Sequence, residues 1–176
     1  MKKEILLLLL WALPISLSAQ MPASIQREEM KKLDYMIGQW QGSGWIDREG
    51  GRQSFAGTET VQGKLGGIAL LVEGNFKGKL AGAEEESTVH ETLAVISYDE
   101  KAKVYRFRTY LATGSSGDHE IKMIEGGWEW GMQTSRGNVR FTMKLTEKGE
   151  WFEIGEFSQD ATTWRKFFEM TLQRVE

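Results

Sequence analysis

The chain has 176 residues, of which 40% are apolar and 27% are charged, and its formal net charge is -3. This is the composition of an ordinary soluble globular protein, and a single domain of this length buries a sizeable core. Acidic and basic residues are interspersed, so the basic stripe of a nucleic-acid-binding protein is missing. Twenty glycines, seven tryptophans and only two prolines indicate many strands joined by tight turns.

The N-terminus has the pattern of a secretory signal peptide. A pair of lysines precedes an apolar run over residues 5–17, and small residues follow up to Ala19. The run is shorter than the roughly 20 apolar residues of a membrane-spanning helix, although an uncleaved anchor is the alternative. We expect residues 1–19 to be removed and residues 20–176 to form one exported domain, periplasmic or extracellular, without a stable membrane span.

Residues 24–36 are predicted to form a helix. Ser24 is a suitable N-cap, and Glu28 and Glu29 occupy the first turns, where the helix dipole favours acidic side chains. The apolar residues fall near one face, and Gly38 is a natural C-terminal stop.

From Gln39 onwards, short strand patterns alternate with turn residues, and no second helical pattern follows. Consecutive hairpins of this kind predict an all-β fold, a single antiparallel up-and-down β-barrel of about ten strands, with a β-sandwich as the alternative. The stretch Gly78–Glu86 is the one long loop. The expected strands are 39–48, 52–64, 68–78, 87–98, 103–113, 118–125, 127–134, 137–146, 150–158 and 163–175.

One strand suggests a polar anchor inside the barrel. The segment 103–113 places Arg106, Arg108 and Tyr110 on one face, opposite a more apolar face. With His90 on a neighbouring strand, these residues could bind a carboxylate in an otherwise apolar cavity, because Arg offers a planar fork suited to that group. The alternative is an outer face with both guanidinium groups in solvent. The predicted apolar lining, whose alternative is plain core packing, consists of Trp128, Trp130, Phe141, Met143, Phe168 and Met170.

Several of these segments carry a resemblance to a known superfamily. A short helix, then Gly38-Gln39-Trp40, then antiparallel strands that end in Leu172-Gln173-Arg174-Val175, resembles the calycin superfamily of lipocalin-like barrels. Within it, the chain is similar to small secreted bacterial lipocalin-like proteins of unknown function. The phrases LDYMIGQWQGSGW, LAVISYDEKAKVYRFRTY and KFFEMTLQRV support this, and the resemblance covers nearly all of the mature chain. It implies that Trp40 packs at the closed end of the barrel and that Arg174 lies across it.

Closure of the barrel follows from this resemblance. We expect the first and last strands to pair, because closure removes the free sheet edges. The helix should then cap the same end and place Leu33 or Ile37 against Trp40. If Trp40 and Arg174 lay at opposite ends of the molecule, a sandwich would take the place of the barrel.

Cofactor and metal patterns are weak in this chain. The superfamily resemblance extends to haem-binding ten-stranded barrels with a proximal histidine late in the chain, but the last histidine here is His119, so we expect no haem and no other cofactor. His90 and Glu91 are adjacent on a strand and so point to opposite faces. Because the chain has no cysteine, we expect neither a conventional zinc site nor a disulfide nor a lipoprotein anchor.

Catalytic patterns have simpler interpretations. The segment 114–119, GSSGDH, contains serine, aspartate and histidine, but its glycines already explain a turn, and a triad needs members from separated segments. Two inward carboxylates with pKa values pushed apart could do acid–base work, whereas solvated outer-face charges are the simpler interpretation. The carboxylates whose strand positions allow an inward orientation are Glu59, Glu73, Glu156 and Glu169.

Three functions remain open. The first is a secreted or periplasmic lipocalin-like protein that binds a small apolar or amphipathic molecule in the barrel cavity. The second is an isomerase- or cyclase-type enzyme that uses an inward Glu or Tyr of the same cavity. The third is a structural or interaction barrel with a filled core. A cavity above roughly 300 Å³ favours the first two, and two carboxyl groups inside it with perturbed pKa values favour the enzyme.

Overall fold

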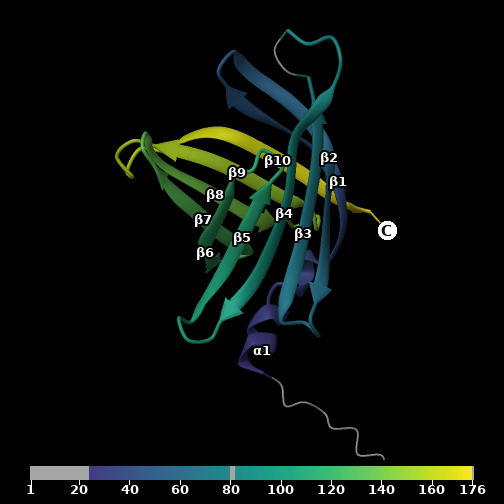
Figure 1. The fold of residues 1–176 in the computed structure, drawn as a ribbon, viewed down its shortest axis with the longest axis vertical. Coiled ribbons are helices and arrows are strands. Elements are labelled where there is room, and N and C mark those ends of the chain that lie inside the picture. Colours follow the sequence, from purple (N-terminus) through teal and green to yellow (C-terminus); the bar gives the residue numbers. More distant parts are fainter. Residues whose placement is uncertain (1–23, 80–81, 176) are drawn as a thin grey trace, which may run out of the picture.

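The described residues of the computed structural model, 24–79 and 82–175, form a closed barrel of ten antiparallel strands (Figure 1). Each strand pairs with the next along the chain, and β1 pairs with β10 to close the barrel. The predicted up-and-down barrel is therefore confirmed, whereas the predicted signal peptide lies outside the described residues. Within 24–79 and 82–175, no helix has the length and apolarity needed to cross a bilayer.

Each predicted strand corresponds to one observed strand, and the bounds differ by at most two residues at either end. Glycines with positive φ mark several turns, among them Gly50 at 98°, Gly126 at 73° and Gly149 at 76°. These glycines allow tight reversals that other residues would strain. The strands are β1 (Gly38–Arg48), β2 (Gly51–Lys64), β3 (Ala69–Gly78), β4 (Ser87–Asp99), β5 (Val104–Leu111), β6 (Ser116–Ile124), β7 (Gly127–Thr134), β8 (Gly137–Leu145), β9 (Trp151–Ser158) and β10 (Arg165–Val175).

The N-terminal helix is shorter than the predicted 24–36. Helix α1 covers Ile25–Lys31, and a separate 3₁₀ turn, η1, covers Asp34–Met36. Between them Leu33 leaves the helical region, with φ -107° and ψ 3°. Leu33 and Met36 are both fully buried. Packing of these side chains against the barrel, and not local helix preference, therefore decides where the helix ends.

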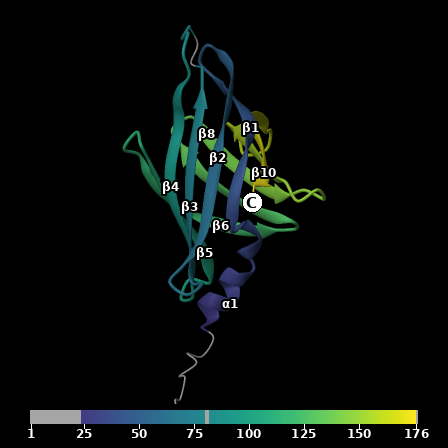
Figure 2. The same cartoon turned by 90° about the vertical axis from the view of Figure 1, so that its right-hand side faces the viewer.

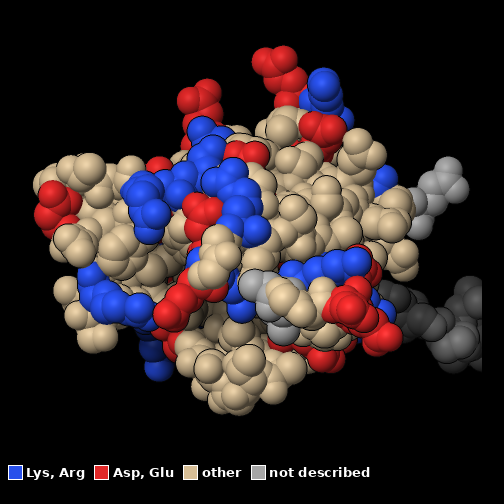
Figure 3. Space-filling model, turned by 90° about the horizontal axis from the view of Figure 1, so that it is seen from above, with Lys and Arg blue, Asp and Glu red and all other residues tan. Residues whose placement is uncertain are grey.

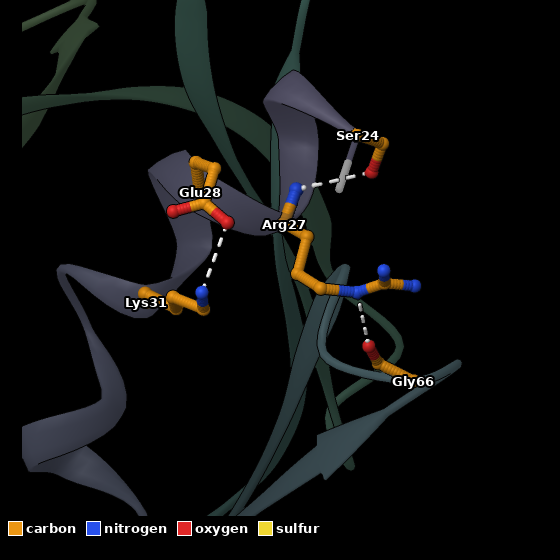
Figure 4. Close-up of polar contacts among 5 residues, drawn as sticks. All are labelled: Ser24, Arg27, Glu28, Lys31 and Gly66. Atoms are coloured by element: carbon orange, nitrogen blue, oxygen red, sulfur yellow. Dashed lines mark hydrogen bonds and ion pairs between the residues drawn. The ribbon is translucent and has the colours of Figure 1, made fainter. Parts of the chain in front are cut away.

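Polar contacts hold α1 at one end of the barrel (Figures 2 and 4). The Oγ of Ser24 accepts a hydrogen bond from the Arg27 backbone N–H at 3.3 Å, which is the predicted N-cap. Arg27 Nε donates to the carbonyl of Gly66 at 2.8 Å, so the helix is tied to the turn between β2 and β3. Glu28 and Lys31 form an ion pair at 2.9 Å on the exposed side of the helix.

The barrel closes where the first and last strands meet. Trp40 on β1 is opposite Arg174 on β10, and the Arg174 Cζ lies 4.3 Å from the centroid of the indole ring. The guanidinium group also donates to the carbonyls of Tyr35 and Ile37, which lead into β1. This is the arrangement that the calycin resemblance implies, and it joins the two ends of the chain at the end that carries α1.

Trp40 is fully buried at this closed end. Its Nε1 donates to the carbonyl of Met36 at 2.7 Å, and its ring meets Trp151 edge-to-face at 5.7 Å. Gly38 has φ 145°, and a Cβ there would lie 2.5 Å from Nη1 of Arg174. The backbone conformation therefore favours glycine at this position, and the absence of a side chain leaves room for the arginine.

Candidate ligand-binding cavity

A cavity of about 430 Å³ lies inside the barrel. It begins above Met36 and Trp151 at the closed end, and it reaches Arg48, the last residue of β1, and Ser115 in the β5–β6 turn at the opposite end. That volume is within the range of small-molecule sites, so side chains do not fill this barrel. Figure 3 shows the upper end of the molecule, where acidic and basic side chains lie beside one another.

Aromatic rings form one wall of the cavity, contributed by β5 to β8. Trp130 and Phe141 stack with their centroids 4.8 Å apart and their planes at 12°. Phe107 meets Trp128 and Trp130 edge-to-face at 5.6 Å and 5.2 Å, and the His119 ring lies 4.6 Å from Trp130. This wall offers flat, apolar surfaces against which a ring-containing or aliphatic ligand packs.

Two carboxyl groups face the same cavity from different strands. Glu59 on β2 is opposite Trp40, is only 7% exposed, and its Oε2 has no hydrogen-bond partner within the described part of the chain. Glu153 on β9 accepts a hydrogen bond from Trp151 Nε1 at 3.0 Å. Gly74 on β3 leaves room for the first group, because a Cβ there would lie 2.7 Å from Glu59 Oε1.

Burial raises the pKa of both carboxyl groups. The pKa of Glu59 rises to about 8, chiefly because the carboxylate loses its solvation and secondly because it is repelled by Glu153. Loss of solvation raises the pKa of Glu153 to about 7, although the hydrogen bond from Trp151 acts in the opposite direction. Near neutral pH, both groups can therefore gain or lose a proton, unlike an ordinary glutamate.

The histidines of the cavity behave in the opposite way. Burial, with a smaller contribution from Arg48, lowers the pKa of His90, and burial lowers the pKa of His119 although Asp118 acts against it. Both imidazoles are thus mainly neutral at pH 7. Arg48 carries the permanent positive charge at the end of the cavity remote from α1.

Most of the predicted lining residues do line the cavity. Met143 is the exception, because it is 1% exposed and packs in the core beside the cavity without lining it. Binding by the lining residues stays a prediction, because this is a statement of position alone. The predicted residues that line the cavity are His90, Trp128, Trp130, Phe141, Phe168 and Met170.

The predicted inward position of Arg106, Arg108 and Tyr110 is wrong. None of the three lines the cavity, and each guanidinium group instead pairs with an acidic side chain of β6 at 3.2 Å. Tyr110 is 52% exposed. The opposite face of β5, which includes Phe107, points inward, because burying that more apolar face is favourable whereas burying two guanidinium groups is costly.

The carboxylates divide differently from the sequence-based expectation. Of the four candidates, only Glu59 lines the cavity. Glu73 is exposed, and Glu156 and Glu169 each form an ion pair with a basic residue at 2.7 Å. Glu153, which the sequence analysis did not single out, is the second inward acid.

A signal for Glu153 is present in the sequence. In the segment Trp151–Phe157, alternation places Glu153 on the same face as Trp151, Gly155 and Phe157. An acid flanked on its own face by a tryptophan and a glycine belongs to the inward face once that tryptophan is assigned to the core. Within the described ranges, no group of three or more metal-ligating side chains is placed to hold an ion.

Comparisons with known proteins concern the fold. No protein-family model matches the chain, and no curated protein matches it. The structure is similar to that of Rv2717c from M. tuberculosis, with a TM-score of 0.58 and 8% identity over 84% of this chain and 97% of that one. It is also similar to the S-type phycobiliprotein lyase CPES from Guillardia theta, with a TM-score of 0.57 and 9% identity over 87% of this chain and 98% of that one. These likenesses concern the barrel fold alone.

Proposed function

We propose that this protein binds a small, largely apolar or amphipathic molecule in the barrel cavity. The observation that carries the proposal is a cavity of about 430 Å³ with aromatic walls and polar atoms left unpaired. Trp128 Nε1 and Glu59 Oε2 are buried and lack hydrogen-bond partners among the residues that the structure describes. Unpaired buried polar atoms are unfavourable, so a ligand with a matching acceptor and donor gains affinity from them.

A neutral fluorescent probe tests this proposal. N-phenyl-1-naphthylamine becomes bright in apolar surroundings, and we expect saturable binding with one site per chain. Thr92 lines the cavity, so Thr92→Phe should reduce the affinity at least about tenfold by occupying the space. Leu93 is the matched control, because it is 39% exposed and its alternation places it on the outer face. If Leu93→Phe weakens binding as much as Thr92→Phe does, the probe binds elsewhere and the proposal fails.

The natural ligand can be sought directly. Native mass spectrometry of protein purified from its own host should show a bound mass that is retained in the gas phase and lost on unfolding. The same measurement on Thr92→Phe should show the unliganded mass, because the cavity is smaller there.

We also propose that the protein acts after export, in the periplasm or outside the cell. The lysine pair, the apolar run and the small residues before Gln20 support this. N-terminal sequencing of the protein from its host should begin at or near Gln20. An intact Met1 on soluble cytoplasmic protein would contradict it.

The carboxyl pair favours a second candidate, acid–base catalysis on the bound molecule. A desolvated carboxylate with a raised pKa is a stronger base than an ordinary glutamate. The likeness in fold to a lyase is compatible with this candidate.

5-Nitrobenzisoxazole is a suitable probe for such a base, which removes the C3 proton while the N–O bond breaks to give 2-cyano-4-nitrophenolate. We expect the rate to increase as pH rises through about 8 and to be lost in Glu59→Gln. Glu73→Gln is the control, because Glu73 is exposed. If Glu59→Gln reacts as fast as Glu73→Gln, Glu59 is not the base.

A further inference from the structure

The charges that face the cavity are unevenly distributed. Its acids lie near the closed end, where Glu59 is opposite Trp40 in the β1–β2 ladder and Glu153 follows Trp151 on β9. β3, the other neighbour of β2, contributes only apolar lining. The ionisable side chains that line the cavity are Arg48 on β1, Glu59 on β2, His90 on β4, His119 on β6 and Glu153 on β9.

No basic side chain of the protein is placed to neutralise the two acids from inside the cavity, as far as the described residues go. Arg48 is eight residues along β1 from Trp40, which spans about 26 Å at 3.3 Å per residue. At such a distance the Coulomb attraction between Arg48 and either carboxylate is small. Arg174 lies against the buried indole of Trp40 and donates to the carbonyls of Tyr35 and Ile37. The described residues therefore leave the pair without a positive partner, which a bound molecule can supply.

The remaining surroundings also favour a cation. Trp151 lines the cavity next to Glu153, and the face of an indole ring carries negative quadrupole charge that attracts cations. An anionic group would instead meet two acids. Glu59 Oε2, buried and without a partner among residues 24–79 and 82–175, can accept a hydrogen bond from an ammonium group.

We propose that the ligand is an organic cation, whose apolar body packs between the aromatic side chains and whose ammonium group binds to Glu59 and Glu153. This rests on the proposed binding function and adds the charge class of the ligand. Burial holds a proton on Glu59 in the empty cavity at pH 7, because its pKa is about 8. The cation stabilises the carboxylate, so binding expels that proton and becomes tighter as pH rises.

Three matched probes separate charge from shape: 4-phenylbutylamine, 4-phenylbutan-1-ol and 4-phenylbutanoate, each displacing N-phenyl-1-naphthylamine at pH 8.5. The amine keeps its proton at this pH, and we expect it to displace the dye at least about tenfold better than the alcohol, with the carboxylate weakest. In Glu59→Gln this preference should fall at least about tenfold, although the dye itself still binds. In Glu73→Gln, an exposed position on β3, the preference should be unchanged.

Proton release gives an independent measurement. Calorimetry of amine binding at pH 7 in phosphate and in Tris, which differ in ionisation enthalpy, should show release of roughly 1–1.5 protons, mostly from Glu59 and partly from Glu153. The alcohol should release none. The amine affinity should rise roughly fivefold or more between pH 7 and 8.5. The lowered pKa values of His90 and His119 exclude them as the source, so the released protons come from Glu59 and Glu153.

The outcomes distinguish the two proposals. If the alcohol or the carboxylate displaces the dye as well as the amine does, or if the amine fails to displace it, the ligand is not a cation, although the cavity still binds. If Glu59→Gln keeps the full preference for the amine, the cation does not bind at these carboxyl groups, and this inference is overturned. If the dye does not bind at all, the proposed function itself fails.

Discussion

The closed end of the barrel and the cavity above it bury polar groups in opposite ways. At the closed end, Trp40 Nε1 donates to a backbone carbonyl and Arg174 donates to two, so these polar groups are paired, and only the Tyr35 hydroxyl lacks a partner among the described residues there. In the cavity, Glu59 keeps an oxygen without a partner among the described residues, beside a second acid, Glu153. Paired groups contribute to stability, whereas buried unpaired ones lower it. The contrast indicates that the closed end maintains the fold and that the cavity carries the function.

The largest expected effect breaks the closed end. Trp40→Ala should lower the free energy of unfolding by about 3–5 kcal/mol, because a fully buried ring, its hydrogen bond and its contact with Trp151 are lost together. Urea unfolding measures the change. Trp164→Ala is the control on a partly exposed ring over Arg140, and it should cost about 1 kcal/mol or less. Equal losses in the two variants would contradict a special role for the closed end.

The next largest effect concerns Glu59 in the cavity, and it is a dependence of stability on pH. Glu59 has a folded pKa of about 8 against an ordinary value of 4.5, so between these pH values the folded state holds a proton that the unfolded state has released. The contribution of the Glu59 carboxyl to the free energy of unfolding is therefore fully present below about pH 4.5. It is lost as pH rises from there through 8. Relative to wild type, Glu59→Gln should gain roughly 2–4 kcal/mol of stability between pH 5 and pH 8.5.

Urea unfolding at the two pH values measures this gain. Glu73→Gln is the matched control, and its difference from wild type should be the same at both pH values. A Glu59→Gln difference that is equally independent of pH would show that the Glu59 carboxyl is not desolvated in the folded protein.

A smaller effect measures the contribution of Arg174 to the stability of the closed end. Arg174→Ala should cost about 1–2 kcal/mol, from the cation–π contact, two hydrogen bonds to carbonyls and the packing of its alkyl stem. Arg174 is exposed, so the loss should be well below that of Trp40→Ala. Arg174→Lys keeps the charge but not the fork, and thermal unfolding should place it between wild type and Arg174→Ala. A loss in Arg174→Lys larger than that in Arg174→Ala would contradict this account.

The smallest effect concerns the outer face of β5. Arg108→Ala should change the free energy of unfolding by less than about 0.5 kcal/mol, because its ion pair with Asp118 is exposed. Binding of N-phenyl-1-naphthylamine should be unchanged, in contrast to Thr92→Phe. If Arg108→Ala loses dye binding, Arg108 faces the cavity, and the assignment of the inward and outward faces of β5 is wrong.

The strands were predictable because their limits are set locally. Turn glycines such as Gly126 and Gly149 interrupt alternating segments, and both features are properties of neighbouring residues. The closing pair of Trp40 and Arg174 came from the superfamily resemblance instead, because no local rule connects positions so far apart. The end of α1 was misplaced because burial of Leu33, a tertiary contact, decides it.

The candidate site was less predictable because the orientation of a strand is a tertiary property. Arg106 and Phe107 alternate on β5 whichever face is inward, so a single choice of face assigns every side chain of that strand. The sequence already showed that the face with Phe107 is the more apolar one, which favours placing it inward. The hypothesis of a carboxylate anchor led to the opposite assignment. Glu59 and Glu153 come from strands that are not adjacent, so only the closed barrel brings them to one cavity.

The ladder between β1 and β10 has a consequence for the order of folding. The other nine ladders join strands that are consecutive in the chain and can form as hairpins soon after each is synthesised. The closing ladder must wait for β10, and it carries the highest loop-closure entropy of the ten. Until then, the nascent sheet exposes the free edge of β1, which invites pairing with other chains. Pairing of β10 with β1 is thus the step that removes this exposed edge during biosynthesis.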